Sequence, residues 1–467
     1  MKTDTIAAIA TAVSDSGIGI IRLSGEEAIE IADKVYRSKN GKKKLSEVES
    51  HTIHYGFIYD ADEMIDEVMV AVMKAPNTYT RENTVEIDCH GGILVMNRIL
   101  EVVLKNGCRL AEPGEFTKRA FLNGRIDLSK AEAVMDIIHS KNEFALKSSV
   151  NQLKGSVSNK VRSLRDELIY EIAFIESALD DPEHISLDGY HDRLEEKTHH
   201  IINELDRLIK SADNGKMLKD GINTVIVGKP NAGKSSLLNV LVGEDKAIVT
   251  SVAGTTRDVL EESIKLHGVG LNMIDTAGIR DTEDEVEKIG VEKARKYAGN
   301  ADLIIYVVDS SKPLDENDDE IIRLIADKKC IVLLNKTDLE QVVMQEELEK
   351  KFNDCGSLNG NLYRMIKTST KENTGIEEFE NTIKDMFFDG KIAINDEIYI
   401  TNQRHKEALQ EALDSMNMVL GSLDMDMPED FYSIDLMSAY AALGRIIGEE
   451  VGEDLVNEIF SKFCMGK

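Results

Sequence analysis

The stretch Gly228–Ser235 reads Gly-Lys-Pro-Asn-Ala-Gly-Lys-Ser and matches the G-x-x-x-x-G-K-[ST] pattern of phosphate-binding loops. Before it, the apolar and β-branched residues 224–227 predict a buried strand, and after it residues 236–241 predict a helix. A strand, a glycine-containing loop and a helix in this order direct backbone N–H groups and a helix N-terminus toward a bound phosphate. The stretch therefore predicts a P-loop α/β domain that binds a nucleoside triphosphate with magnesium.

The residues of this loop have separate expected roles. Gly228 and Gly233 let the backbone turn its N–H groups toward the phosphates. Lys234 is expected to reach the β- and γ-phosphates, and Ser235 is expected to ligate magnesium. The residues of this segment expected to contact the nucleotide are Asn231, Ala232, Gly233, Lys234, Ser235 and Ser236.

Three later motifs complete a nucleotide site. The aspartate of Asp-Thr-Ala-Gly at 275–278 is expected to hold magnesium through water, and the glycine N–H is expected to contact the γ-phosphate. In Asn-Lys-Thr-Asp at 335–338, the carboxylate of Asp338 can accept two hydrogen bonds from guanine N1 and N2, which selects GTP over ATP. Ser-Thr-Lys at 369–371 is expected to close over the base, and the four elements in this order predict a Ras-like GTPase domain. The residues assigned to the site here are Asp275, Thr276, Ala277, Gly278, Asn335, Lys336, Asp338, Ser369, Thr370 and Lys371.

Residues 250–258 read Thr-Ser-Val-Ala-Gly-Thr-Thr-Arg-Asp and are typical of a switch segment. One threonine hydroxyl is expected to complete the magnesium shell, and we assign that role to Thr256. A segment of this kind orders around the γ-phosphate and relaxes after hydrolysis. The residues expected to contact the nucleotide here are Thr250, Ser251, Val252, Ala253, Gly254, Thr255 and Thr256.

Ile279 stands where Ras-type enzymes have the glutamine that orients the attacking water. Because isoleucine cannot hydrogen-bond water, the orienting group is expected to come from elsewhere. The following residues 280–287 include several acids. Most of these acids are expected to belong to a solvated loop, and one is expected to orient or polarise the water.

Length and composition limit the class of protein. The chain has 467 residues, which at about 150 residues per domain predicts about three domains. Its five cysteines are scattered and odd in number, which argues against a disulfide framework, and the single Cys89-His90 pair is not expected to bind metal. Neither a signal peptide nor an apolar run near the ~20 residues of a membrane span is evident, so we expect a cytoplasmic protein.

The formal net charge of −29 argues against a large nucleic-acid footprint, because phosphate binding requires clustered lysines and arginines. The run Lys-Asn-Gly-Lys-Lys-Lys at 39–44 is short and predicts a solvated loop. If the substrate is an RNA, much of the binding is therefore expected to come from a partner.

The hydrophobic pattern predicts a multidomain fold, α/β plus all-α. Residues 1–118 mix short strands and helices, as in an α+β domain; strands are expected at 18–23 and 67–73, and a helix at 95–105. Residues 119–215 and 381–467 are helical on either side of the GTPase domain at 216–380, which is therefore expected to be inserted into one helical domain. The helices expected in it are 131–138, 161–179, 192–210, 402–423 and 433–463.

Three further stretches carry a resemblance that covers the whole chain. They are Pro-Gly-Glu-Phe-Thr-Lys-Arg-Ala-Phe-Leu-Asn at 113–123, Gly-Thr-Thr-Arg-Asp at 254–258 and Phe-Cys-Met-Gly-Lys at 463–467. In these stretches the chain resembles the MnmE (TrmE) family of tRNA modification GTPases, and the Cys-x-Gly-Lys terminus is specific for that family among GTPases of this type. The nucleotide motifs alone do not separate it from related ribosome-assembly GTPases.

The resemblance implies a potassium-dependent GTPase. Asn231, Thr250, Val252 and Thr255 match the family's potassium ligands, and the ion takes the place of an arginine finger beside the phosphates. Ser235 and Thr256 match the magnesium ligands, and Glu287 matches the catalytic glutamate that orients water through a bridging water. The family forms homodimers, whose two GTPase domains meet across their switches when GTP and potassium are bound.

The resemblance also assigns a function to the N-terminal domain, which carries no motif that can be interpreted unaided. In this family the domain forms the dimer and binds a tetrahydrofolate one-carbon donor, either 5-formyl- or 5,10-methylenetetrahydrofolate. Arg22, Glu86, Arg125 and the terminal Lys467 match folate-contacting positions, although lysine is frequent at the Arg125 position. No base is evident beside Cys464, so its part in one-carbon chemistry stays open.

The implied function is modification of the tRNA wobble uridine at C5, together with the flavoprotein MnmG (GidA) in a heterotetramer or larger complex. GTP hydrolysis would drive conformational changes rather than take part in bond formation. Two alternatives stay open: an RNA-binding GTPase switch in ribosome assembly, and a folate-dependent transferase that acts without a partner. The first alternative predicts a basic RNA-binding domain, which this acidic chain does not show.

Overall fold

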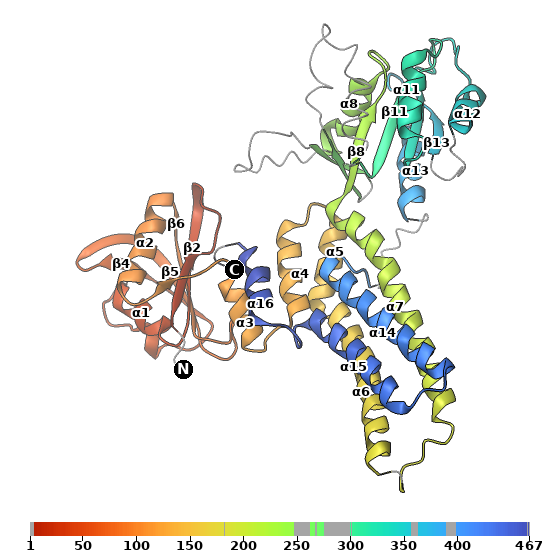
Figure 1. The fold of residues 1–467 in the computed structure, drawn as a ribbon. Coiled ribbons are helices and arrows are strands. Elements are labelled where there is room, and N and C mark those ends of the chain that lie inside the picture. Colours follow the sequence, from red (N-terminus) through yellow and green to blue (C-terminus); the bar gives the residue numbers. More distant parts are fainter. Residues whose placement is uncertain are drawn as a thin grey trace. The chain divides into compact units, whose positions relative to one another are not determined.

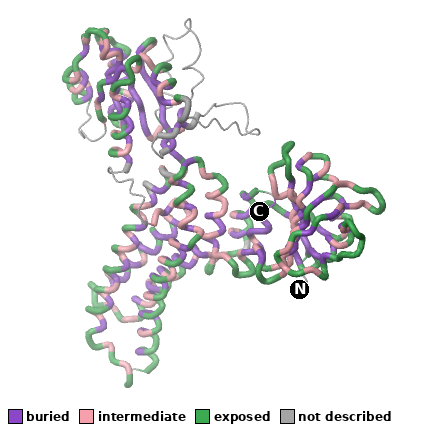
Figure 2. Tube along the Cα trace, turned by 180° about the vertical axis from the view of Figure 1, so that it is seen from behind, coloured by how far each residue is buried: buried purple, intermediate pink, exposed green. Residues whose placement is uncertain are grey.

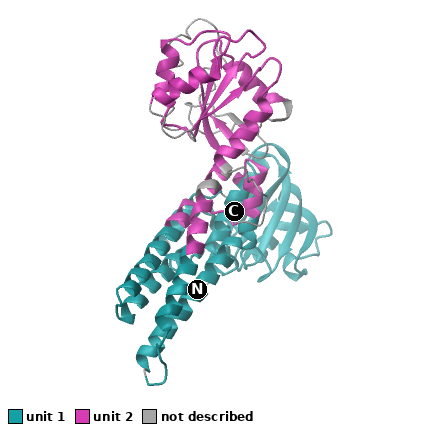
Figure 3. Ribbon diagram, turned by 90° about the vertical axis from the view of Figure 1, so that its right-hand side faces the viewer, with its two compact units in different colours: residues 1–138, 151–202, 408–467 teal, residues 139–150, 203–407 magenta. Residues whose placement is uncertain are grey.

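The computed structural model describes residues 4–181, 183–246, 262–266, 269–274, 299, 301–355, 363–388, 398–464 and 466. The chain divides into two compact units (Figure 3). Unit 1 comprises residues 1–138, 151–202 and 408–467, and unit 2 comprises residues 139–150 and 203–407. In the part of the chain that is described, no helix is long and apolar enough to cross a membrane.

Unit 1 begins with a seven-stranded sheet in the order β3-β4-β5-β6-β2-β1-β7. Neighbouring strands run antiparallel except for β1 and β7, which are parallel. Along β5, Val68, Val70 and Val72 are buried while Met69 between them is exposed, as the two-residue period of a strand with one covered face requires. The strands are β1 (Ile6–Ile9), β2 (Ser16–Ser24), β3 (Tyr36–Ser38), β4 (Thr52–Asp60), β5 (Glu63–Met73), β6 (Thr84–Gly91) and β7 (Arg109–Leu110).

The helices α1 (Ala28–Val35) and α2 (Ile93–Lys105) cover the buried face of this sheet (Figure 1). In α2 the buried residues recur at the spacing of one helix face, because its apolar side must meet the sheet. These residues are Met96, Ile99, Val102 and Val103. A short 3-10 helix, η1 (Leu45–Glu47), lies between β3 and β4, and α3 (Glu115–Leu122) follows the sheet.

The helical region contains α4 to α7 and α14 to α16. In α6 the buried side chains recur every three or four residues, and this face packs on α15. Gly448, in the left-handed region at φ +87°, ends α15, so the single helical run expected at 433–463 is divided into two helices. The helices are α4 (Leu128–His139), α5 (Glu143–Lys154), α6 (Ser156–Asp180), α7 (Tyr190–Asp220), α14 (Gln403–Asp424), α15 (Glu429–Ile447) and α16 (Glu453–Ser461).

Unit 2 contains a six-stranded sheet in the order β13-β12-β11-β8-β10-β9, parallel except for the antiparallel pair β9 and β10. Apolar side chains of α8 and α13 pack on one face of the sheet, and those of α11 and α12 pack on the other. The strands are β8 (Ile222–Val227), β9 (Glu262–Leu266), β10 (Val269–Met273), β11 (Leu303–Asp309), β12 (Cys330–Asn335) and β13 (Tyr363–Lys367). The helices are α8 (Lys234–Lys246, with a break at Gly243), α11 (Glu316–Ile325), α12 (Gln345–Asp354) and α13 (Ile376–Phe388).

The central strands of this second sheet are buried on both faces, as Figure 2 shows in purple. All seven residues of β11 and all six of β12 are buried, which accounts for the apolar runs that precede their polar last residues, Asp309 and Asn335. The chain is thus a multidomain α/β and all-α protein with a P-loop domain. The predicted strands and helix around the phosphate loop are found as β8, β10, β12 and α8.

Candidate nucleotide site and C-terminal tail site

The phosphate loop joins β8 to α8 and lies against the carboxyl ends of β11 and β12. Gly233 has φ +104°, and a Cβ atom there would lie 2.1 Å from Nδ2 of Asn335. Gly228 has φ +146°, and a Cβ atom there would lie 2.3 Å from the Val307 carbonyl oxygen. Both positions therefore require glycine, because backbone conformation and packing each exclude a side chain.

The Lys234 ammonium group lies within the loop that precedes it. It donates hydrogen bonds to the carbonyl oxygens of Gly228 at 2.8 Å and Lys229 at 2.6 Å. Ser235 and Ser236 lie exposed in the first turn of α8, where the helix dipole favours an anion. Asn231, at φ +59°, is also exposed. This segment of the predicted site is therefore open to solvent and offers donors to a phosphate.

Asn335, at the end of β12, connects the phosphate loop to the predicted base-binding loop. Its Nδ2 donates to the carbonyl oxygen of Ala232 at 2.9 Å, and its Oδ1 accepts from the backbone N–H of Thr370 at 3.2 Å. The Asn335 side chain is buried, so both amide functions need these partners. One side chain thus holds together two segments that are far apart in the sequence.

The Asp338 carboxylate lies beside the residues predicted to close over the base. Its Oδ1 accepts a hydrogen bond from the Ser369 hydroxyl at 2.8 Å, and its Oδ2 lies 3.9 Å from the Lys371 ammonium. The side chain is 10% exposed, which leaves oxygen surface for further donors. A carboxylate fixed in this way can accept the paired N–H donors of an aminopyrimidinone.

Two groups near the site, the Asp309 carboxylate and the Lys229 ammonium, are absent from the sequence-based prediction. Lys336, at φ +66°, ion-pairs with Asp309 at the end of β11, with Nζ and Oδ2 2.7 Å apart. Burial raises the pKa of Asp309, but hydrogen bonds from Lys336 and Ser311 outweigh it, so the net pKa lies below the usual value. An acid at the carboxyl end of a buried apolar run is the signal that identifies Asp309 from sequence.

The second missed group ties the phosphate loop to α11. Lys229, the second residue of the loop, places its ammonium 2.7 Å from Asp318 and 3.0 Å from Asp315. Asp318 is fully buried and also accepts the Tyr306 hydroxyl at 2.7 Å. Asp315 and Asp318 form a capping box at the start of α11, a pattern that can be read from the run Asp-Glu-Asn-Asp at 315–318.

Several assigned positions lie outside the described residues. They are the switch residues 250–256, the 275–278 motif, the proposed water-orienting Glu287 and the terminal Lys467. Of the residues assigned to GTP and metals, the structure describes Asn231, Ala232, Gly233, Lys234, Ser235, Ser236, Asn335, Lys336, Asp338, Ser369, Thr370 and Lys371.

In unit 1, the C-terminal tail reaches the N-terminal sheet at Arg22, one of the residues expected to contact folate. Arg22 on β2 ion-pairs through Nε with Glu86 on β6 at 2.7 Å, because these two residues are direct cross-strand partners. Arg22 also donates through Nη1 to the carbonyl oxygen of Gly466 at 3.0 Å. The Cys464 carbonyl accepts from the Gly114 N–H at 3.3 Å, and the Cys464 side chain is exposed.

Arg125, the third described residue of the expected folate set, does not contact this pair. Its guanidinium lies over the Tyr79 ring, 4.8 Å from the centroid, and the Tyr79 hydroxyl is 3.0 Å from the Thr117 hydroxyl. Arg22 thus contacts both Glu86 and the C-terminal tail, whereas Arg125 makes a cation–π contact with Tyr79.

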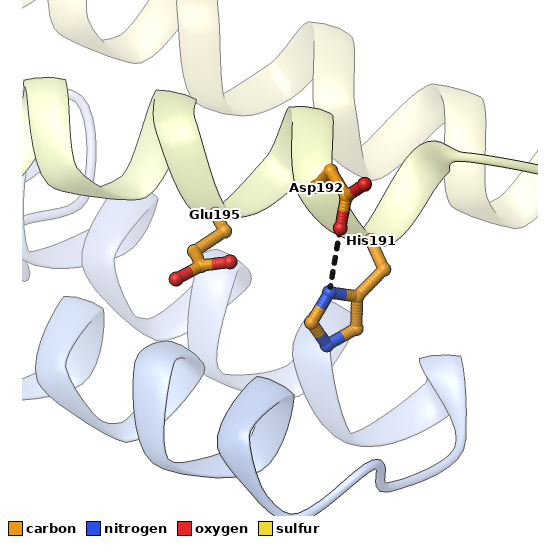
Figure 4. Close-up of side chains that lie close together, drawn as sticks. All are labelled: His191, Asp192 and Glu195. Atoms are coloured by element: carbon orange, nitrogen blue, oxygen red, sulfur yellow. Dashed lines mark ion pairs between the residues drawn. The ribbon is translucent and has the colours of Figure 1, made fainter.

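Three side chains at the start of α7 form another cluster of ligand-type groups (Figure 4). His191 Nδ1 lies 3.7 Å from Asp192, and its Nε2 is 3.0 Å from the Leu423 carbonyl oxygen at the end of α14. The acids Asp192 and Glu195 lie in the first turns of α7, where the helix dipole favours negative side chains and opposes a cation. We therefore interpret this cluster as the N-terminal end of α7, which is hydrogen-bonded to the end of α14 through His191.

Known proteins resemble the chain over its full length. The family profile "MnmE helical domain" matches residues 128–464, and the profile "GTP-binding protein TrmE N-terminus" matches residues 5–125. The tRNA modification GTPase MnmE of Lachnoclostridium phytofermentans is 58% identical over 467 residues, which is 100% of both chains. The protein of the same name from Bacillus subtilis is 47% identical, over 99% of this chain and 100% of that one.

Among solved structures, the G domain of the T. maritima FeoB iron transporter is 25% identical to the chain. The match covers 36% of this chain and 98% of that one, with a TM-score of 0.25. The full-length relatives and the two family profiles decide the assignment. The chain belongs to the MnmE family of tRNA modification GTPases.

Proposed function

We propose that this GTPase is activated by potassium and works with the flavoprotein MnmG (GidA) on tRNA. The product would carry an aminomethyl or carboxymethylaminomethyl group at C5 of the wobble uridine. The one-carbon donor would be 5-formyl- or 5,10-methylenetetrahydrofolate. The observation that carries the nucleotide part is the Asn335 amide, which links the phosphate loop to the loop beside Asp338.

GTP fits the donors and acceptors of this site. Lys234 and the backbone N–H groups at the start of α8 would hold the phosphates, and the Asp338 carboxylate would accept the guanine N–H pair. Because Asp338 is oriented by Ser369 and faces Lys371, its two oxygens are fixed before the base arrives. Adenine lacks that donor pair, so the arrangement supports GTP over ATP.

Magnesium and potassium would both bind around the phosphate loop. Ser235 and Thr256 would ligate magnesium, and Asn231, Thr250, Val252 and Thr255 would hold potassium. A monovalent cation beside the phosphates supplies positive charge where negative charge develops in hydrolysis. Asn231 is exposed in the phosphate loop at φ +59°, so its amide is accessible to a cation beside the phosphates. Glu287 would orient the attacking water.

The N-terminal domain would bind the folate donor through Arg22, Glu86, Arg125 and Lys467. A guanidinium and a carboxylate side by side suit the mixed donor and acceptor edge of a pterin. The hydrogen bond from Arg22 to the Gly466 carbonyl supports a site that includes the C-terminal tail. Cys464 is exposed in that tail, and its chemical part stays open.

We also propose the assembly and the domain limits. The domains would be 1–118 for folate binding and dimerisation, 119–215 and 381–467 for the helical domain, and 216–380 for the GTPase domain. Two copies would form a homodimer, and the homodimer would join MnmG in a heterotetramer or larger complex.

The test of potassium activation compares hydrolysis in KCl and NaCl. Wild-type protein should hydrolyse GTP faster in KCl than in NaCl. In KCl, Asn231→Ala should hydrolyse GTP about 10²-fold more slowly than wild type, because one group that stabilises the transition state is removed. The matched control is Asn239→Ala on the exposed side of α8, which should keep the wild-type salt preference. Equal wild-type rates in the two salts would overturn the proposal.

The test of the reaction is mass analysis of wobble uridines from cells that lack this protein. The C5 substituent should be missing, and it should return with the wild-type chain. A chain truncated before Cys464 should hydrolyse GTP but fail to restore the modification. Unchanged wobble uridines in the deletion strain would contradict the proposed function.

A further inference from the structure

The run of lysines at 39–44 borders a groove in unit 1. The groove has a volume of about 730 Å³ and lies between this loop and the first residues of β4. Its lining includes Lys39, Lys42, Lys43 and Lys44 of the loop together with Thr52 and His54 of β4. The sequence predicts no more than a solvated loop here, because the strand that forms the second wall is not adjacent to it in the sequence.

The loop is held in a defined conformation on both sides of the lysines. At its start, the Ser38 carbonyl accepts from the Gly41 N–H at 2.8 Å, and the Ser38 hydroxyl accepts from the Lys43 N–H at 3.1 Å. At its end, Leu45 is fully buried, and the Asp33 carboxylate accepts the Ser46 N–H at 2.9 Å. The ammonium groups therefore project from a pre-organised backbone, which lowers the entropy cost of binding.

Among the described residues these lysines have no acidic partner, in contrast to several arginines of the same unit. Arg109 and Arg119 each form ion pairs with Glu115, and Arg165 forms one with Glu449. Where the structure describes the chain, no ion pair links Lys39, Lys42, Lys43 or Lys44 to an acid, and all four are exposed. Four lysines face two glutamates, Glu47 and Glu49, so the groove is positive in a chain of net charge −29.

The first residues of β4 add neutral polar groups to the groove. Burial, followed by the positive charge of Lys43, lowers the pKa of His54, so its ring is neutral at pH 7 and lies 2.8 Å from the Thr52 hydroxyl. Tyr55, the next residue of β4, points to the opposite face of the strand, where its ring packs against Phe57 and its hydroxyl donates to Glu67 at 2.6 Å. The groove therefore offers charge and neutral polar groups to a ligand, and its lysines carry the attraction for an anion.

We propose that this groove binds the sugar–phosphate backbone of the tRNA substrate; the inference rests on the proposed function. An acidic protein repels a polyanion at long range, so it needs a local positive site at which phosphates can displace counterions. Four lysines spread along an open groove suit a run of phosphates better than a single small anion. The groove carries no base-specific donor set, so it would position the RNA rather than select its sequence.

The test measures binding of unmodified tRNA to the full-length protein across a range of KCl concentrations. The variant K39Q/K42Q/K43Q/K44Q should bind more weakly, and its slope of log K against log salt should fall by about 3, at about 0.7 to 0.9 for each phosphate that the protein no longer neutralises. The matched control removes four lysines of unit 2 and should change the slope by less than about 1. That control is K312Q/K328Q/K350Q/K367Q.

A second control reverses the sign of the change. The variant E47Q/E49Q removes the two carboxylates of the groove and should tighten tRNA binding. GTP hydrolysis by every variant should match wild type, because none of these side chains lies in the nucleotide site, and this readout also checks folding.

The outcomes separate the inference from the function on which it rests. If K39Q/K42Q/K43Q/K44Q binds tRNA with the wild-type affinity and slope, the groove proposal is wrong and the proposed function stands. If that variant keeps tRNA binding but loses the flavoprotein partner, the groove is a protein interface and the proposal is also wrong. If cells lacking the protein keep normal wobble uridines, the proposed function itself fails.

Discussion

The ion pairs of Lys229 with Asp315 and Asp318 connect the phosphate loop to α11 and allow a quantitative prediction for Asp318→Asn. Asp318 is fully buried and accepts three hydrogen bonds, from the Tyr306 hydroxyl at 2.7 Å, the Lys229 ammonium at 2.7 Å and the Asp315 N–H at 3.0 Å. The substitution keeps the shape of the side chain but replaces one accepting oxygen by an NH₂ group. Whichever way the amide turns, a buried donor loses its acceptor, and the charge that pairs with Lys229 is removed.

The expected cost follows from these contacts. A hydrogen bond to a charged group contributes about 1.5–3 kcal/mol, and an orphaned buried donor adds about 1 kcal/mol or more. Lys229 keeps its contact with Asp315, which limits the loss. We expect Asp318→Asn to lower the local free energy of unfolding by about 2–4 kcal/mol. Tyr306→Phe, which removes one neutral hydroxyl and leaves the ion pair, should cost about 1 kcal/mol.

The assay is amide hydrogen exchange of the full-length protein, under conditions in which exchange reports equilibrium opening. A decrease of 2–4 kcal/mol corresponds to exchange about 30- to 700-fold faster in β8 and β11, and Tyr306→Phe should give about 5-fold. Amides of β4 and β5 in unit 1 should be unchanged and serve as the internal control. The reasoning is refuted if Asp318→Asn accelerates β11 exchange no more than Tyr306→Phe does.

Two further predictions concern unit 1. Gly448→Ala should destabilise the helical region by about 2 kcal/mol, because φ is +87° and the new Cβ would lie 2.8 Å from Phe121; Gly421→Ala, with nothing within 4 Å, should not destabilise it in urea unfolding. Burial raises the pKa of Glu115, but hydrogen bonds from Arg109, the Glu112 backbone and Arg119 outweigh it, so the net pKa lies below 4.5. The ionised Glu115 carboxylate therefore stabilises the folded state above pH 4.5, and this contribution is lost as pH falls through the lowered pKa. In Glu115→Gln the free energy of unfolding should fall less steeply with decreasing pH than in wild type, and an unchanged slope would contradict this.

The parts of the fold that could be predicted are those with a local cause. Buried parallel strands are apolar along their whole length, so β8, β10 and β12 are visible in the sequence with their ends within one or two residues. The phosphate loop is equally local, because its glycines and lysine lie within eight residues. The division of the last helical run at Gly448 was also open to prediction, since Gly448 and Gly452 flank the break between α15 and α16.

The parts that could not be predicted depend on side chains brought together from distant positions. Arg22 and Gly466 are 444 residues apart in sequence, and the hydrogen bond between them exists only because the tail returns to the N-terminal sheet. Lys229 meets Asp315 across 86 residues because β8 and β11 are neighbours in the sheet. The loop motif allows any residue at the position of Lys229, so the sequence pattern does not indicate what its ammonium group contacts.

The net charge is a second property from which local contacts could not be predicted. A value of −29 describes the average charge of the chain and predicts that it has no broad basic face. It does not describe a groove whose lysines have no acidic partners within ion-pair distance, because at short range the nearest charges dominate and more distant ones are screened within about 8–10 Å. Local pairing, read from the structure, therefore decides where an acidic protein can meet a polyanion.

The contacts of the phosphate loop also bear on how nucleotide affinity and base selection are related in this chain. The Asn335 amide holds Ala232 on the phosphate side and Thr370 on the base side, and the Lys229 ammonium holds the loop to α11. Asp338, by contrast, contacts Ser369 and Lys371 on the base side of the site. Asn335 and Lys229 thus hold the phosphate loop in place, whereas in the proposed GTP site Asp338 would act only where guanine differs from adenine. For that site we expect substitution of Asp338 to change the preference for guanine, and substitution of Asn335 to lower the affinity for every nucleotide.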